Sequence, residues 1–241
     1  MTEHISRKEL KQDKIKETLE HGAEAVYSHS KLATVLVLAI LLAACAYGGW
    51  SFYDQRQTAK AEVEFDAAMK IYNARIAGAP EPAADPTEKI YPSESARAQD
   101  AVPKFQAVAA KYPNTNAGRL SIYYVALCYE NMEQINQALE QLKKISDSSD
   151  KELAAMAQYQ TSVIDARTGK TDDAVKILRG LKDKPTVLVP RPVVLLDLAG
   201  LLKASNPTEA ISLYQQVKKD YPEPTISEEA DRGLNSVAPK S

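Results

Sequence analysis

The chain has 241 residues, and its 30 basic and 32 acidic side chains leave a formal net charge of −2. This balance gives no electrostatic reason to expect a nucleic-acid partner. The length leaves room for one membrane segment and one domain of medium size. Glycine is scarce, whereas Ala, Leu, Lys, Glu and Gln are abundant, so an all-α fold is expected.

Residues 1–31 form a charged tail that contains a helix signal. Ser6 and Glu9 have the spacing of a capping box, in which the serine oxygen accepts a hydrogen bond from the amide of Glu9. Apolar residues recur at helical spacing after it. We therefore predict a short helix that either docks on a membrane partner or the lipid surface, or is simply solvated.

The run from Leu32 to Tyr53 contains no Asp, Glu, Lys or Arg. A helix needs about 20 apolar residues to cross a bilayer. A cleaved signal peptide has a shorter apolar run and a short basic segment before it, so we interpret residues 32–53 as an uncleaved signal anchor. Trp50, Phe52 and Tyr53 at its end are predicted to lie at the membrane interface.

An alternative for this run is lipidation. Leu42-Ala43-Ala44-Cys45 matches the lipobox pattern of bacterial lipoproteins, in which Cys45 is lipidated and becomes the mature N-terminus. A lipoprotein usually turns polar after its cysteine, whereas this run stays apolar, so the anchor is favoured. The other cysteine, Cys128, lies in a predicted helix, and the two form neither a disulfide framework nor a metal-type spacing.

Basic residues close to the two ends of the run are balanced. Arg7, Lys8 and Lys11, further out, favour a cytoplasmic tail. The domain at 54–238 is then expected on the opposite side of the membrane.

The domain at 54–238 contains a repeat. Four segments begin with an alanine at intervals of 36 or 37 residues, and a large apolar residue follows four and again seven positions later. Spacings of four and seven place the three residues on one helix face. The three rows are Ala101, Ala138, Ala174 and Ala210; Phe105, Leu142, Leu178 and Tyr214; and Val108, Ile145, Leu181 and Val217.

Each repeat helix is preceded by another apolar-periodic stretch, at 54–76, 120–132, 153–168 and 193–204. Cap and stop signals separate them: Asp150, Gly169, Asn206, Pro113 and Pro222. A segment with four prolines, 78–92, interrupts the first pair and is predicted to be a loop.

Antiparallel helix pairs with this period resemble tetratricopeptide repeats. The likeness lies in the small residue, the aromatic residue or leucine four positions later, and the proline twelve positions later in the first and fourth copies; the signature tryptophan is absent. The predicted architecture is an N-terminal transmembrane helix followed by a tetratricopeptide-like α-solenoid of about four helix pairs.

In tetratricopeptide solenoids the first helix of each pair lines a concave groove, and a groove with aromatic anchors suits a peptide or a partner helix. The alternative is that these residues pack as core between repeats. Carried over onto this chain, the resemblance implies these partner-binding positions: Tyr123, Leu127, Tyr159, Val163, Arg167, Leu195 and Lys203.

The predicted domain carries no recognisable catalytic motif. All three histidines, His4, His21 and His29, lie in the tail, and no glycine-rich phosphate loop or partnered nucleophile occurs. The sequence therefore predicts neither an enzyme nor a cofactor, and repeat folds mostly bind other proteins.

The whole layout resembles the bacterial ancillary subunit of the Sec translocon, which has a short cytoplasmic tail, one membrane helix and a periplasmic tetratricopeptide-like domain. The closest local likeness is Gly49-Trp50-Ser51-Phe52-Tyr53, continuing into 57–72. The resemblance implies an inner-membrane protein that docks near the translocon, with a membrane-bound periplasmic chaperone, to handle emerging envelope proteins. A lipidated envelope-assembly scaffold and a cell-division or polysaccharide-export scaffold are the alternatives.

Overall fold

The computed structural model describes residues 30–78 and 89–237. These residues form α-helices, as predicted, with one isolated bridge between Ile76 and Tyr91. The predicted tail helix and most of the proline-rich segment lie outside the described residues. Contacts between residues divide the chain into two compact units, Met1–Arg56 and Gln57–Ser241.

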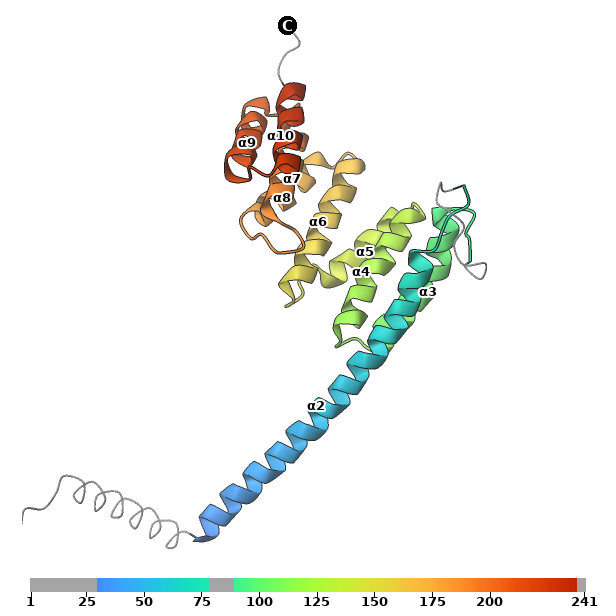
Figure 1. Ribbon diagram of the computed structural model, residues 1–241, viewed down its shortest axis with the longest axis vertical. Helices are drawn as coiled ribbons and strands as arrows, with labels where there is room; N and C mark the ends of the chain where they lie inside the picture. The colour runs from blue at the N-terminus through green and yellow to red at the C-terminus, as the bar shows by residue number, and fades with distance from the viewer. Residues whose placement is uncertain (1–29, 79–88, 238–241) are drawn as a thin grey trace, which may run out of the picture. The chain divides into compact units, whose positions relative to one another are not determined.

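Helix α2 (Ser30–Tyr72) contains both the apolar run and the first predicted repeat helix (Figure 1). Among the described residues it is the one helix that is long and apolar enough to cross a membrane, and none of its most apolar stretch is buried. A core helix would be buried, so this stretch is not part of a protein core. The helix ends four residues before the predicted end, because Ile76 pairs with Tyr91 instead.

The second unit continues as a series of helices joined by turns (Figure 1). Four pairs are present, as predicted: the end of α2 packs on α3, α4 on α5, α6 on α7, and α8 on α9. An additional helix, α10, packs against α8 and α9. The bounds are α3 (Glu94–Lys111), α4 (Asn116–Asn131), α5 (Ile135–Ile145), α6 (Lys151–Arg167), α7 (Thr171–Lys182), α8 (Arg191–Leu202), α9 (Pro207–Asp220) and α10 (Pro224–Val237).

The core follows the predicted repeat. Ala101, Ala138, Ala174 and Ala210, on the second helix of each pair, all have an exposure of 0%. The large apolar residues four and seven positions later are buried as well. Successive core clusters join α2 to α4, α4 to α6, and α6 to α10, as expected for stacked helix pairs.

Side-chain caps begin two helices where the sequence predicts them. The Oδ1 atom of Asp150 accepts from the backbone N–H of Leu153 at 3.2 Å, and Oδ1 of Asn206 accepts from that of Glu209 at 3.2 Å. Gly169 ends α6 with a φ of 84°, in the left-handed region. The equivalent position of the preceding pair is Glu133, whose φ of 59° is disfavoured for a side chain with a Cβ.

A carboxylate holds the connection between α7 and α8. Glu152, in the first turn of α6, accepts from the backbone N–H groups of Val187 at 3.0 Å and Leu188 at 2.9 Å. These bonds, led by that from Leu188, lower the pKa of Glu152 because they favour its charged form. The contact ties the start of α8 to α6.

A glycine permits the close approach of α10. A Cβ atom added at Gly233 would lie 2.3 Å from Cε1 of Tyr214, whose ring is buried and cannot easily shift. We expect Gly233→Ala to lower the free energy of unfolding by about 1–3 kcal/mol, measured by urea denaturation.

Gly180 on α7 is the matched control, since nothing lies within 4 Å of the equivalent Cβ atom there. Gly180→Ala should raise the free energy of unfolding by about 0.5–1 kcal/mol, because a helical alanine loses less entropy on folding. Similar effects of the two substitutions would contradict the close packing at Gly233.

Candidate functional site

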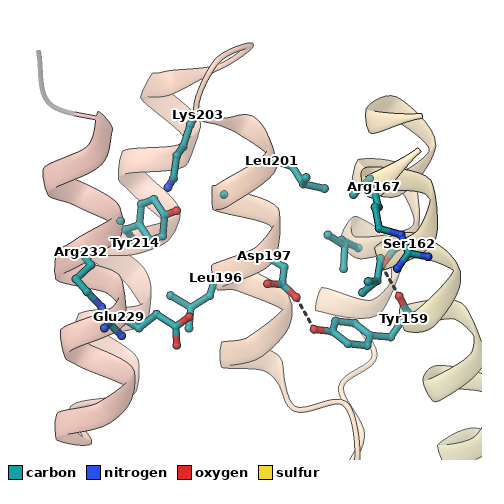
Figure 2. A pocket seen from close by; sticks show the side chains of 15 residues that line it. Tyr159, Ser162, Arg167, Leu196, Asp197, Leu201, Lys203, Tyr214, Glu229 and Arg232 are labelled. Carbon is teal, nitrogen blue, oxygen red and sulfur yellow. Dashed lines mark hydrogen bonds between the residues drawn. The ribbon is translucent and has the colours of Figure 1, made fainter. Parts of the chain in front are cut away.

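The first helices of the last two pairs, α6 and α8, and the additional helix α10 line an open groove with a volume of about 780 Å³ (Figure 2). We call it the α6–α8–α10 groove. Its walls combine apolar residues with a few charged ones, the usual make-up of a ligand-binding site. The lining residues are Tyr159, Ser162, Val163, Ala166 and Arg167 of α6; Leu196, Asp197, Gly200 and Leu201 of α8, with Lys203 just after it; Glu229, Arg232 and Gly233 of α10; Leu178 of α7; and Tyr214 of α9.

Asp197 is the most unusual lining residue. It lies half-buried in the otherwise apolar helix α8, and the hydroxyl of Tyr159 donates to its Oδ2 atom at 2.5 Å (Figure 2). Burial raises the pKa of Asp197, and the charge of Glu229 on α10 raises it further, against the opposing effect of the Tyr159 hydrogen bond. Burial and the bond to Asp197 also raise the pKa of Tyr159. The groove therefore has an acidic side where α6, α8 and α10 face one another.

Three basic residues line other parts of the groove. Nη1 of Arg167 forms an ion pair with Oε1 of Glu130 on α4 at 2.9 Å. The ammonium of Lys203 lies 5.8 Å from the ring centroid of Tyr214, a cation–π distance. Arg232 is exposed on α10. The cationic groups thus lie apart from the carboxylate of Asp197, and none of them is among the groups that shift its pKa.

The structure brings four of the predicted partner-binding residues together in the groove: Tyr159, Val163, Arg167 and Lys203. Tyr123 and Leu127 lie on α4, outside its lining, and both are half-buried. The ring of Tyr123 contacts that of Tyr124 with centroids 5.9 Å apart. Burial, as the largest cause, raises the pKa of Tyr123 to about 12.

The prediction that Leu195 lines the groove is wrong, because this residue is buried in the core. Its side chain has an exposure of 0% and belongs to the core cluster of the last helices. The residue that faces Tyr159 is Asp197, two positions further along α8. Each residue turns a helix by 100°, so a shift of two positions exchanges a core position for a groove position.

Sequence reasoning missed the groove residues of α8 and α10: Asp197, Gly200, Leu201, Glu229 and Arg232. Helix α8 is apolar on nearly all sides, so its periodicity could not identify the face turned to the groove. A usable signal was Asp197 itself, the one charged residue between Pro192 and Leu202.

A second, smaller cavity of about 490 Å³ lies between α5, α6 and α7. Its one buried charge, Asp165, has the ammonium of Lys170 3.7 Å from Oδ1, so this group has a partner within the protein. Across residues 30–78 and 89–237, no cluster of His, Cys, Asp and Glu side chains is placed to hold a metal ion. Burial raises the pKa of Cys128 to about 12, so this thiol stays protonated at neutral pH.

Comparison with known protein families gives two matches. The profile of a family described as tetratricopeptide repeat-like domain matches residues 27–186, well over half of the chain, and that of the tetratricopeptide repeat matches residues 194–224. No curated protein and no solved structure gives a match.

The raised pKa of Asp197 predicts a specific pH dependence. Since its pKa is higher in the folded than in the unfolded state, ionised Asp197 lowers stability at neutral pH, and stability is regained as pH falls through the folded pKa. We expect Asp197→Asn to raise the melting temperature by a few degrees at pH 7. The difference from the native chain should vanish at a pH below about 4, the unfolded pKa of an aspartate.

Thermal melts at a series of pH values measure this difference. Asp66→Asn, on an exposed part of α2, is the control and should change the melting temperature little at any pH. Destabilisation by Asp197→Asn at pH 7 would mean that the charged hydrogen bond with Tyr159 outweighs the burial of Asp197.

Proposed function

Because this chain belongs to the tetratricopeptide repeat-like domain family, we propose that it is a membrane-anchored scaffold whose α6–α8–α10 groove binds a segment of another protein. Families of this repeat generally act as protein-interaction scaffolds and not as catalysts. The groove between first helices is the observation that carries the proposal. It is open, has apolar walls and holds a small number of convergent polar groups.

The individual side chains of the groove also suit a segment of another polypeptide chain. Val163 and Leu201 offer apolar surface from two helices, while Tyr159 offers an aromatic ring whose hydroxyl is already bonded within the protein. An apolar side chain of a partner that packs on Val163 and Leu201 loses water contact, and the Tyr159 hydroxyl beside them already has a hydrogen-bond partner in the protein. This arrangement matches the anchor-and-pocket pattern of peptide recognition.

The membrane anchor is proposed from the exposed apolar part of α2. Trp50 is 64% exposed, Tyr53 is 62% exposed and Phe52 is 56% exposed, so more than half of each residue predicted at the interface is open to its surroundings. The guanidinium of Arg56 lies 4.5 Å from the ring centroid of Phe52, which suits the boundary between lipid and headgroups. We place the tail in the cytoplasm and the repeat domain in the periplasm, in a bacterial inner membrane.

The finer proposal is a role near the Sec translocon, together with a membrane-bound periplasmic chaperone, in handling emerging envelope proteins. What supports it is the order of segments: a charged tail, an apolar helix and a tetratricopeptide-like domain. The competing proposals are a scaffold lipidated at Cys45 and a cell-division or polysaccharide-export scaffold.

Replacing Val163 by glutamate tests the groove. A charge at this position would be buried under a bound segment, so we expect recovery of the partner to fall by at least about tenfold. The measurement is quantitative mass spectrometry of Sec subunits and periplasmic chaperones that co-purify with the full chain in mild detergent.

Val63→Glu is the matched control, because Val63 is 70% exposed and lies outside the groove. This variant should recover as much partner as the native chain. Full recovery with Val163→Glu would rule out the groove as the binding site. Recovery of division proteins without Sec subunits would rule out the translocon role while leaving the groove in place.

The intact mass of the membrane-extracted protein tests the anchor. An uncleaved anchor should give the full 26.4 kDa of the chain. Cys45→Ala should change this mass only by the sulfur atom that the substitution removes, and should leave the membrane association unchanged. Loss of all residues before Cys45, with an added lipid mass that Cys45→Ala abolishes, would establish the lipoprotein instead.

A further inference from the structure

We propose that the acidic side of the α6–α8–α10 groove receives a lysine or arginine side chain of the bound protein segment, between Asp197 and Glu229. This inference rests on the proposed function of the groove and names the chemistry of its partner. The partner is a segment in which a basic residue is flanked by apolar residues. The basic side chain meets the two carboxylates, and the apolar residues pack on Val163 and Leu201.

The first argument is the convergence of acidic and aromatic groups from separate helices. Asp197 comes from α8, Glu229 from α10 and Tyr159 from α6, and all three line the groove. Figure 2 shows the Asp197 carboxylate pointing toward Tyr159, and Glu229 lies close enough for its charge to raise the pKa of Asp197. The Tyr159 hydroxyl occupies one acceptor position of Asp197. A carboxylate has about four such positions, so Asp197 keeps the capacity to accept from a further donor.

The second argument is that the carboxylates of Asp197 and Glu229 form no ion pair within the described part of the protein. Half-burial and the like charge of Glu229 both make the ionised form of Asp197 unfavourable. In the described part of the chain, neither Asp197 nor Glu229 has a cationic side chain within ion-pair distance. A cation that entered from outside would supply the interaction that the protein itself does not make there.

The third argument is that two of the three basic residues of the groove, Arg167 and Lys203, are held elsewhere. Arg167 is paired with Glu130, and Lys203 lies over the ring of Tyr214. They therefore do not compete with a guest cation for Asp197. An arginine guest could donate through its planar fork to the Asp197 carboxylate, whereas a lysine guest would act as a point charge.

The opposite arrangement, an acidic segment directed to Lys203 and Arg232, uses the same groove. We favour the basic segment because the half-buried Asp197 has no cation beside it among the described residues, whereas the half-buried Lys203 lies over the ring of Tyr214. Arg232 and Glu229 are both exposed to water. Interactions of a partly buried charge are screened less than those of an exposed one, so Asp197 has the larger influence on which partner binds.

Three fluorescein-labelled peptides test the proposal on the full chain in detergent. They share the core Leu-Ala-Xaa-Ala-Leu and differ only in the central residue, which is lysine, norleucine or glutamate. We expect the lysine peptide to bind about tenfold more tightly than the norleucine peptide by fluorescence anisotropy, as for a charged hydrogen bond gained on binding. The glutamate peptide should bind most weakly.

Two variants connect this preference to the carboxylates. Asp197→Asn and Glu229→Gln should each remove most of the advantage of the lysine peptide over the norleucine peptide when both peptides are measured on the same variant. Glu228→Gln is the matched control, since Glu228 is the preceding residue of α10 and does not line the groove. It should keep the native preference, which separates a local contact from a general effect of net charge.

Three results would overturn the proposal. They are equal binding of the lysine and norleucine peptides, tighter binding of the glutamate peptide, and an unchanged lysine preference in both carboxylate variants. If peptides bind and Val163→Glu abolishes their binding, only the cation preference is wrong and the groove function stands. If no peptide binds and Val163→Glu also leaves partner recovery unchanged, the groove function is wrong as well.

Discussion

The close approach of helices at four fully buried alanines is the constraint on which the rest of the domain depends. Ala101, Ala138, Ala174 and Ala210 have an exposure of 0%, so neighbouring helices reach van der Waals contact at these positions. A larger residue at any of them would force helices apart, at a cost of about 1–3 kcal/mol. The large residues one and two turns later then fill the space between pairs. Because these faces of the second helices are buried in the core, the groove is lined mainly by the first helices and α10.

The second helices and their caps could be predicted from sequence because their determinants are local. The rows beginning at Ala101 need only helical spacing, and caps such as Asp150 and Asn206 act within three residues of their own position. Helix α2 runs from the apolar run into the first repeat helix as one continuous element. Gly48 and Gly49 lie within the helix without a break.

The groove itself depended on contacts that no local pattern records. The rotation of α8 is coupled to α6 through the Glu152 carboxylate and the amides of Val187 and Leu188, which lie 35 and 36 residues away. Extrapolating the repeat interval from α6 placed Leu195 in the groove, whereas the structure places Asp197 there. Likewise, Gly233 brings α10 against Tyr214, a contact visible in sequence only as a glycine near apolar residues.

Asp197 shows how the demands of folding and of binding differ at one position. Packing alone favours an apolar residue in α8, because burial and the charge of Glu229 both disfavour an ionised carboxylate there. The Tyr159 hydroxyl offsets part of this cost by linking α6 to α8, and so also sets the spacing of two groove walls. A neutral residue would remove the half-buried charge from the wall that α8 contributes, and that wall would accept hydrophobic segments of many kinds. The carboxylate makes the same surface selective, since a partner that brings no positive charge leaves its electrostatic cost unrelieved.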